Sequence, residues 1–192
     1  MPLAKPEAVR IWRVNLGQPR DLFLSPSEKE RAARFHFQRD RERWARARSG
    51  LREILATVVQ RPPLELIFDL GPHGKPSLNH HPIEFNLSHS GEWALVAVSA
   101  LSPVGIDIEV IREDVEIGKL LNRIGEDAPD VPTDQLFQLW ARRESRSKAA
   151  GVGLMDLPGP SIHAVRLEAP PGYAASVALV DAMPEPIYCG SL

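Results

Sequence analysis

The stretch from Val104 to Ile111 reads VGIDIEVI, and its alternation sets the interpretation of the chain around it. Apolar β-branched residues take every second position, which is typical of a strand with one face in a core. Asp107 and Glu109 lie on the other face, where the Cα atoms of a strand are about 6.6 Å apart. Like charges this close repel unless a cation lies between them, so the pair indicates a cation site. The alternative is an exposed strand face whose carboxylates are solvated or paired with arginines.

A third carboxylate comes from the segment WARRESRSKAAG, which begins at Trp140. Trp140, Glu144 and Lys148 are spaced four apart, so they lie along one side of a helix. A solvent-facing Glu144–Lys148 pair is one interpretation, but the tryptophan favours a stripe that faces inward. Buried charges need partners. A divalent metal with a phosphate would supply them, since Mg²⁺ prefers carboxylate oxygens and substrate phosphates.

Length and composition define the broad class of protein. The chain has 192 residues, 43% of them hydrophobic and 25% charged, which is normal for a soluble globular protein. The formal net charge of −2 gives no general attraction to nucleic acid or anionic membrane. Cys189 is the single cysteine, so an intrachain disulfide is excluded and a reducing compartment is expected. No apolar run reaches membrane-spanning length, and the N-terminus lacks the apolar core of a signal peptide, so a cytoplasmic protein is expected.

Each half of the chain contains a long helix and following strands, which predicts an α+β fold of two pseudo-symmetric α/β lobes. The expected division is an N-terminal lobe, 1–101, and a C-terminal lobe, 102–192, with the active site in the cleft between them. Ser25 is expected as a helix N-cap, with Pro26 at the first helical position. The tail MPEPIYCGSL (183–192) is expected to be irregular. Further predicted elements are strands over 9–16, 64–70, 85–90, 91–100, 161–169 and 173–181, and a helix in 133–151 capped by Thr133 or Asp134 and followed by Gly151.

Three other segments could contact anions. A Ser–His hydrolase interpretation of Ser88 and His89 is weak, because neighbours on a strand point to opposite faces and no GxSxG motif is present. They are better interpreted as hydrogen-bond donors to a phosphate at a strand end. Lys75 lies in a tight loop suited to a phosphate oxygen, although there is no P-loop motif. The arginine-rich segment 31–52 could be a salt-bridged helix face, a nucleic-acid patch or a contact zone for anionic groups, and its interleaved acids weaken the nucleic-acid interpretation.

Taken together, these segments resemble the Sfp-type 4′-phosphopantetheinyl transferases, and the resemblance runs from about Leu24 to Gly153. It implies a two-lobed α/β protein with its active site between the lobes. It also implies Mg²⁺-dependent transfer of 4′-phosphopantetheine from coenzyme A to a serine of an acyl or peptidyl carrier protein, releasing 3′,5′-ADP. The matching motifs are RAARFHFQRDRERWARARSGLR (31–52), GKPSL (74–78), FNLSHS (85–90), VGIDIE (104–109) and WARRESRSKAAGVGL (140–154).

The resemblance implies a role for each matching residue. The expected metal ligands are Asp107, Glu109 and Glu144, and the expected catalytic residues are Glu144, as acceptor of the serine proton, and Lys148, which would neutralise phosphate charge. The expected coenzyme A contacts are Arg31, Gly74, Lys75, Asn86, Ser88, His89 and Lys148, with Arg48 as a further candidate.

Three features depart from the family pattern. Arg143-Glu144-Ser145 stands where the family usually has Lys-Glu-Ala, and an arginine fork does not freely replace an ammonium at a phosphate. The segment 119–134 lacks the phenylalanines of the usual FFS-x-x-E motif, and the tail after Gly153 matches poorly. The first of these segments lies near the expected carrier-docking surface, so the alternative is a non-catalytic coenzyme A-binding protein that has lost carrier docking. The expected partners are coenzyme A and an apo carrier protein of fatty acid, polyketide or nonribosomal peptide biosynthesis, without nucleic acid or membrane, and the protein is expected to be a monomer.

Overall fold

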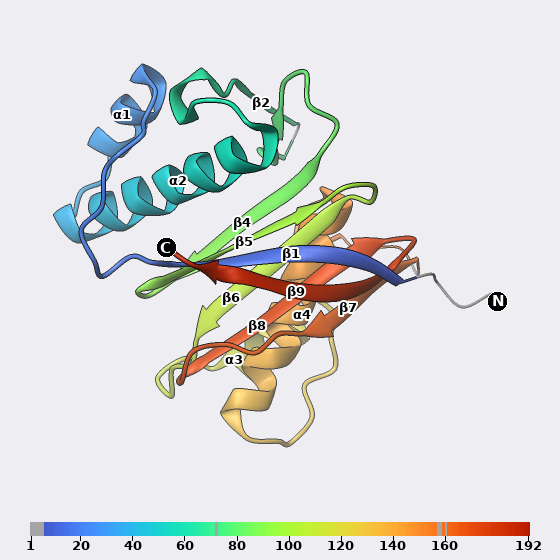
Figure 1. Ribbon diagram of the computed structural model, residues 1–192. Helices are drawn as coiled ribbons and strands as arrows, with labels where there is room; N and C mark the ends of the chain where they lie inside the picture. Colours follow the sequence, from blue (N-terminus) through green and yellow to red (C-terminus); the bar gives the residue numbers. More distant parts are fainter. Residues whose placement is uncertain (1–5, 72, 157–158, 160) are drawn as a thin grey trace.

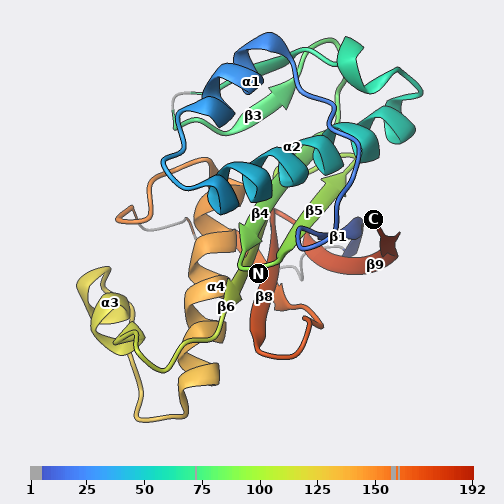
Figure 2. The same ribbon diagram turned by 90° about the vertical axis from the view of Figure 1, so that its left-hand side faces the viewer.

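A computed structural model of the chain describes residues 6–71, 73–156, 159 and 161–192. Within them it shows a mixed α+β fold, which confirms the class expected from the sequence (Figure 1). Two sheets pack face to face, with helices on both outer sides (Figure 2). The helices are α1 (Pro26–Ala33), α2 (Gln38–Val59), the 3₁₀ turn η1 (Pro63–Glu65), α3 (Ile117–Arg123) and α4 (Thr133–Ala150).

The first sheet has the strand order β4-β5-β1-β9, and it joins the two ends of the described chain. Strand β1 pairs antiparallel with β5 and parallel with β9. The expectation of an irregular tail is therefore wrong, because the tail forms β9. Pro184 and Pro186 hide the strand pattern in the sequence, yet proline is tolerated on a strand at the end of a sheet. The strands are β1 (Pro6–Asn15), β4 (Glu84–Ser90), β5 (Trp93–Ser99) and β9 (Met183–Ser191).

The second sheet has the order β6-β8-β7, with antiparallel pairing throughout its described strands. The apolar side of VGIDIEVI faces the first sheet as the alternation predicts, since Ile106 packs in one core cluster with Ile11 of β1. Helix α2 covers the opposite face of the first sheet, where Leu51 packs against Val14. The remaining strands are β6 (Val104–Val110), β7 (Ile162–Arg166), β8 (Tyr173–Val180) and the small hairpin of β2 (Phe68–Leu70) and β3 (Pro76–Leu78).

The helix ends follow the sequence closely, with one difference. Ser25 is the N-cap of α1 and forms a capping box with Glu28, and Gly151 ends α4 in the left-handed conformation at φ 67°. The prediction that Thr133 or Asp134 caps α4 is wrong, because Pro132 holds the N-cap position without a side-chain hydrogen bond. The predicted strand 64–70 is a 3₁₀ turn followed by the short strand β2. Among the described helices, none has the length and apolar character needed to span a membrane.

Candidate active site

The candidate site begins at the seam between β4 of the first sheet and β6 of the second. Alternate residues of a strand share one side, so three polar residues of FNLSHS reach the neighbouring strand together. Two of them hold the carboxylates of VGIDIE, and the third accepts a main-chain hydrogen bond. The bonds run from Ile106 N to Asn86 Oδ1 (3.0 Å), from Ser88 Oγ to Asp107 Oδ1 (2.8 Å) and from Ser90 Oγ to Glu109 Oε2 (2.9 Å).

Gly105 allows helix α4 to lie directly on β6. A Cβ atom added at this glycine would lie within 2.9 Å of three main-chain atoms of α4, namely Ser145 O, Lys148 C and Ala149 N. No other residue type lacks a Cβ, so only glycine permits this approach. The close packing brings the stripe of α4 that carries Glu144 and Lys148 against the strand that carries the carboxylates.

Lys148 is the central cation of the site. Its Nζ donates to Asp107 Oδ1 at 2.6 Å and to Ser88 Oγ at 3.1 Å, and it lies 3.9 Å from Glu144 Oε2. Asp107 is 1% exposed, so its charge needs this partner. Trp140 is partly buried and packs against a core cluster between α3 and α4, and the side chains of Glu144 and Lys148 are 22% and 29% exposed, so this stripe of α4 is half-buried.

The carboxylates shift the pKa values of their neighbours. Burial, together with the negative charge of Asp107, raises the pKa of Glu109 and that of Glu144 above the ordinary glutamate range. Burial alone would lower the pKa of Lys148, but the charges of Asp107 and Glu144 outweigh it and raise that pKa. The lysine is thus held as a cation, while two glutamates accept protons more readily than in water.

The donor set fits a hard cation. In the described part of the chain, no three His, Cys, Asp or Glu side chains already converge as a metal-binding group. However, Asp107 Oδ2 is buried and lacks a hydrogen-bond partner there, which costs about 1–3 kcal/mol for a buried acceptor. Glu109 and Glu144 lie near enough for the charge of Asp107 to raise their pKa values, and all-oxygen donors are those that Mg²⁺ prefers.

A cavity of about 570 Å³ lies on the other side of β4, under α1 and α2. His89 lines it because it points away from Ser88, its neighbour on the strand. Burial and the charge of Lys148 lower the pKa of His89, which keeps its imidazole neutral near pH 7. Arg31 and Gly74 also line this cavity, and the Arg31 guanidinium lies 5.5 Å from the centre of the Trp44 ring. With Arg48 and Arg52 also in its wall, the cavity combines arginine side chains with an aromatic ring.

Lys75 lies at a different place from these cavity residues. Its Nζ donates to Val104 O at 3.0 Å and to Ala149 O at 3.3 Å, and burial lowers its pKa. The structure therefore places this ammonium on main-chain carbonyls at the start of β6 and the end of α4, where it joins the loop of Gly74 to α4.

Arg143 does not extend toward the carboxylates. Its guanidinium pairs with Glu126 Oε1 at 3.1 Å and donates to Leu154 O at 2.9 Å and Asp156 O at 2.7 Å. The side chain is 1% exposed. Arginine at this position holds the segment before α4 and the loop after it against the helix, a role for which its several donors are suited.

Two contributors were not anticipated from the sequence. Ser90 holds Glu109, and its position two residues after Ser88 could have revealed it, since both must lie on one side of a strand. Glu28 lies in the cavity wall and pairs with arginines of α2. The capping-box spacing of Ser25 and Glu28 indicates its place on the helix, but no local pattern indicates its partners.

The fold and the site together define an α+β protein in which a carboxylate–lysine cluster lies beside a cationic cavity. Comparison with known proteins gives its family. Residues 21–101 match the family described as "4′-phosphopantetheinyl transferase, N-terminal". The chain is 34% identical to the 4′-phosphopantetheinyl transferase HetI of a Nostoc species over 170 residues, which are 79% of this chain and 72% of HetI. The chain belongs to the 4′-phosphopantetheinyl transferase family.

Two further relatives show how much of the family's length is present. The chain is 31% identical to the 4′-phosphopantetheinyl transferase Sfp of Bacillus subtilis over 141 residues, covering 69% of this chain and 62% of Sfp. It is 30% identical to the L-aminoadipate-semialdehyde dehydrogenase-phosphopantetheinyl transferase of Xenopus laevis over 156 residues, covering 68% of this chain and 50% of that protein. The chain thus spans between half and three quarters of the length of these relatives.

Proposed function

We propose that the protein transfers 4′-phosphopantetheine from coenzyme A to a serine of an acyl or peptidyl carrier protein, with Mg²⁺ as cofactor and 3′,5′-ADP as the second product. Family membership supports the reaction class. The observation that carries the proposal is the cluster of Asp107, Glu144 and Lys148, which brings carboxylate oxygens of the kind that bind Mg²⁺ together with a fixed ammonium group. Phosphoryl transfer needs mainly positioning and neutralisation of charge, and such a cluster can supply both.

Asp107, Glu109 and Glu144 would hold the metal, which when bound supplies positive charge to the pyrophosphate of coenzyme A. Lys148 places a second positive charge at the same carboxylates and would neutralise the negative charge that develops on the phosphate oxygens during transfer. Glu144 would accept the proton of the carrier serine, for which its raised pKa is suitable. The serine oxygen forms a bond to the β-phosphorus as the bond to the oxygen of 3′,5′-ADP breaks, so the proton leaves the nucleophile and the nucleotide leaves the phosphorus.

The cavity beside β4 is the proposed place of the nucleotide part of coenzyme A. Arg31 and His89 would donate to its phosphates, and Gly74 would let the loop approach without a side chain. Lys75 and Asn86 act in this proposal through the main chain, the first by its bonds to the end of α4 and the second by its bond to β6. Ser88 would share its hydroxyl between Asp107 and the substrate.

We also propose the division into lobes 1–101 and 102–192, with the reaction at the seam between them. The bonds from β4 to Asp107 and Glu109 support this placement, because the two strands belong to different sheets. Strand β9 lies in the range 102–192 but pairs with β1, so the C-terminal part of the chain also supplies a strand of the first sheet.

Intact-mass spectrometry of apo carrier proteins, incubated with the protein, coenzyme A and Mg²⁺, tests the function. A gain of one phosphopantetheine that disappears with EDTA is expected on at least one acyl or peptidyl carrier. Asp107→Ala and Glu144→Ala should abolish the gain while circular dichroism stays native. Near-normal transfer by both variants would refute the metal assignment. Binding of coenzyme A without transfer to any carrier would instead favour a non-catalytic binding protein.

A further inference from the structure

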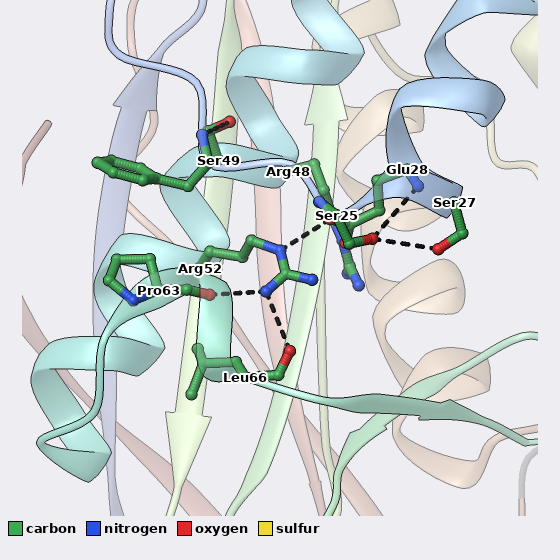
Figure 3. A network of polar contacts seen from close by, with 9 residues as sticks. Ser25, Ser27, Glu28, Arg48, Ser49, Arg52, Pro63 and Leu66 are labelled. Atoms are coloured by element: carbon green, nitrogen blue, oxygen red, sulfur yellow. Dashed lines mark hydrogen bonds and ion pairs between the residues drawn. The ribbon is translucent and has the colours of Figure 1, made fainter.

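A buried carboxylate lies in the wall of the arginine-lined cavity, at the first turn of α1 (Figure 3). Glu28 is 8% exposed, and its Oε2 accepts hydrogen bonds from Ser25 N and from Arg52 Nε, both at 2.8 Å. Its Oε1 accepts from Arg48 Nε. An acid would weaken a site for anions by simple charge, so its presence here needs a structural reason.

The two arginines use their donors differently. Arg52 is 3% exposed, and its Nη1 donates to Pro63 O at 2.6 Å and to Leu66 O at 3.0 Å, so this side chain joins α2 to the segment after it. Arg48 also lines the cavity, and its guanidinium lies 4.0 Å from the centre of the Phe68 ring. Among the described residues, its one hydrogen-bond partner is Glu28, through Nε. The ring and the carboxylate thus fix the plane of the Arg48 guanidinium and leave its terminal nitrogens for a ligand.

We infer that Glu28 is a positioning residue for the nucleotide substrate: by holding Arg48 Nε, it directs the terminal nitrogens of Arg48 into the cavity beside Arg31, where they bind a phosphate monoester. The inference rests on the proposed function, which brings such a nucleotide to this cavity. A guanidinium whose plane is fixed loses less freedom on binding phosphate than a free one, and it can donate two parallel hydrogen bonds.

The sign of one substitution separates this role from simple electrostatics. Glu28→Gln removes a negative charge from the cavity wall, so charge alone predicts tighter binding of an anion. Positioning predicts weaker binding, because an amide holds the Arg48 guanidinium less strongly than a carboxylate does. We expect about tenfold weaker binding, the size typical of one lost charge-assisted hydrogen bond. Glutamine also serves in a capping box, so the helix start is retained.

Isothermal titration calorimetry with two probes, adenosine 3′,5′-bisphosphate and adenosine 5′-monophosphate, measures the effect. The wild-type chain should prefer the bisphosphate, and E28Q should lose most of this preference. R48Q should lose at least as much of it as E28Q, and the double variant E28Q/R48Q should match R48Q, because Glu28 acts through Arg48. Glu30→Gln is the matched control, since it removes the same charge from an exposed position of α1 and should leave both affinities unchanged.

The outcomes are distinct. If the wild-type chain binds neither nucleotide, the proposed function itself fails at this cavity. If it prefers the bisphosphate and E28Q binds that probe equally well or more tightly, the positioning role is refuted while the proposed function stands. If E28Q fails to fold by circular dichroism, R48K decides: it keeps the charge but loses the planar fork, and a wild-type preference in R48K would overturn the inference.

Discussion

Substitution of Gly105 by alanine should separate helix α4 from β6. The added Cβ would lie within 2.9 Å of Ser145 O, Lys148 C and Ala149 N, whereas ordinary van der Waals contacts of Cβ atoms begin near 3.4 Å. All three atoms belong to the main chain, so no side chain can rotate away, and the helix must move by on the order of 1 Å. Overpacking of this kind costs about 1–3 kcal/mol, and a clash with a backbone belongs at the upper end. The same displacement moves Glu144 and Lys148 from the carboxylates, for which a loss of about 10²-fold in transfer rate is expected.

Urea denaturation and carrier mass spectrometry check the two effects together. Gly118→Ala in α3 is the matched control, because the nearest atom to its added Cβ is 3.7 Å away and alanine favours a helix. This control should be as stable as the wild-type chain or slightly more stable, with unchanged transfer. If Gly105→Ala unfolds at the wild-type urea concentration and transfers at the wild-type rate, then α4 does not lie on β6 as described, and the geometric basis of the site is wrong.

The remaining predictions concern buried charges. Lys148→Met removes the cation beside Asp107 and should lower the free energy of unfolding by about 3 kcal/mol. This is the low end for a buried pair, because 29% of the lysine side chain is exposed. Urea denaturation should show that adding Asp107→Asn to the same chain restores much of the lost stability. Arg143→Met should lower the free energy of unfolding by about 3 kcal/mol, because the carbonyls of Leu154 and Asp156 lose their donor. Arg143→Lys should recover less than half of that stability, and equal stability of Arg143→Lys and the wild type would contradict the structural role of this guanidinium. Burial tends to raise the pKa of Glu28, but hydrogen bonds from Arg52, Ser25 N and Arg48 outweigh it and lower that pKa. Its contribution to stability is therefore complete above the unfolded-state pKa and is lost as the pH falls through the lower folded-state pKa, so acid titration of thermal melts should show a loss that E28Q lacks.

The sequence identified much of the site because local patterns carry it. Alternation in VGIDIEVI placed Asp107 and Glu109 opposite the apolar face of the strand, and spacing by four placed Glu144 and Lys148 on one side of a helix. The structure brings Asp107, Glu144 and Lys148 together in this way. The roles assigned to these residues as metal ligands and catalytic groups stay predictions that the assays above address.

The sequence does not predict which partners individual long side chains contact. The loop HGKP suits Lys75 to a phosphate contact, but the loop does not indicate that its ammonium donates to the carbonyls of Val104 and Ala149. Arg143 stands where the family usually has lysine, and the sequence does not indicate that its guanidinium binds Glu126 before α4 and the carbonyls of the loop after it. A long flexible side chain can reach several partners from one Cα position, so residue type and local spacing do not select among them.

By itself, the sequence determined the periodicity of the elements, the helix ends at Ser25 and Gly151, and the family to which the chain belongs. These properties depend on neighbours within a few positions or on similarity along the chain. The tertiary structure alone decided that the tail forms β9 beside β1, and that Glu28 meets Arg48 and Arg52. Strand partners and buried ion pairs join residues far apart in sequence, and their choice depends on how the layers pack, which no local pattern encodes.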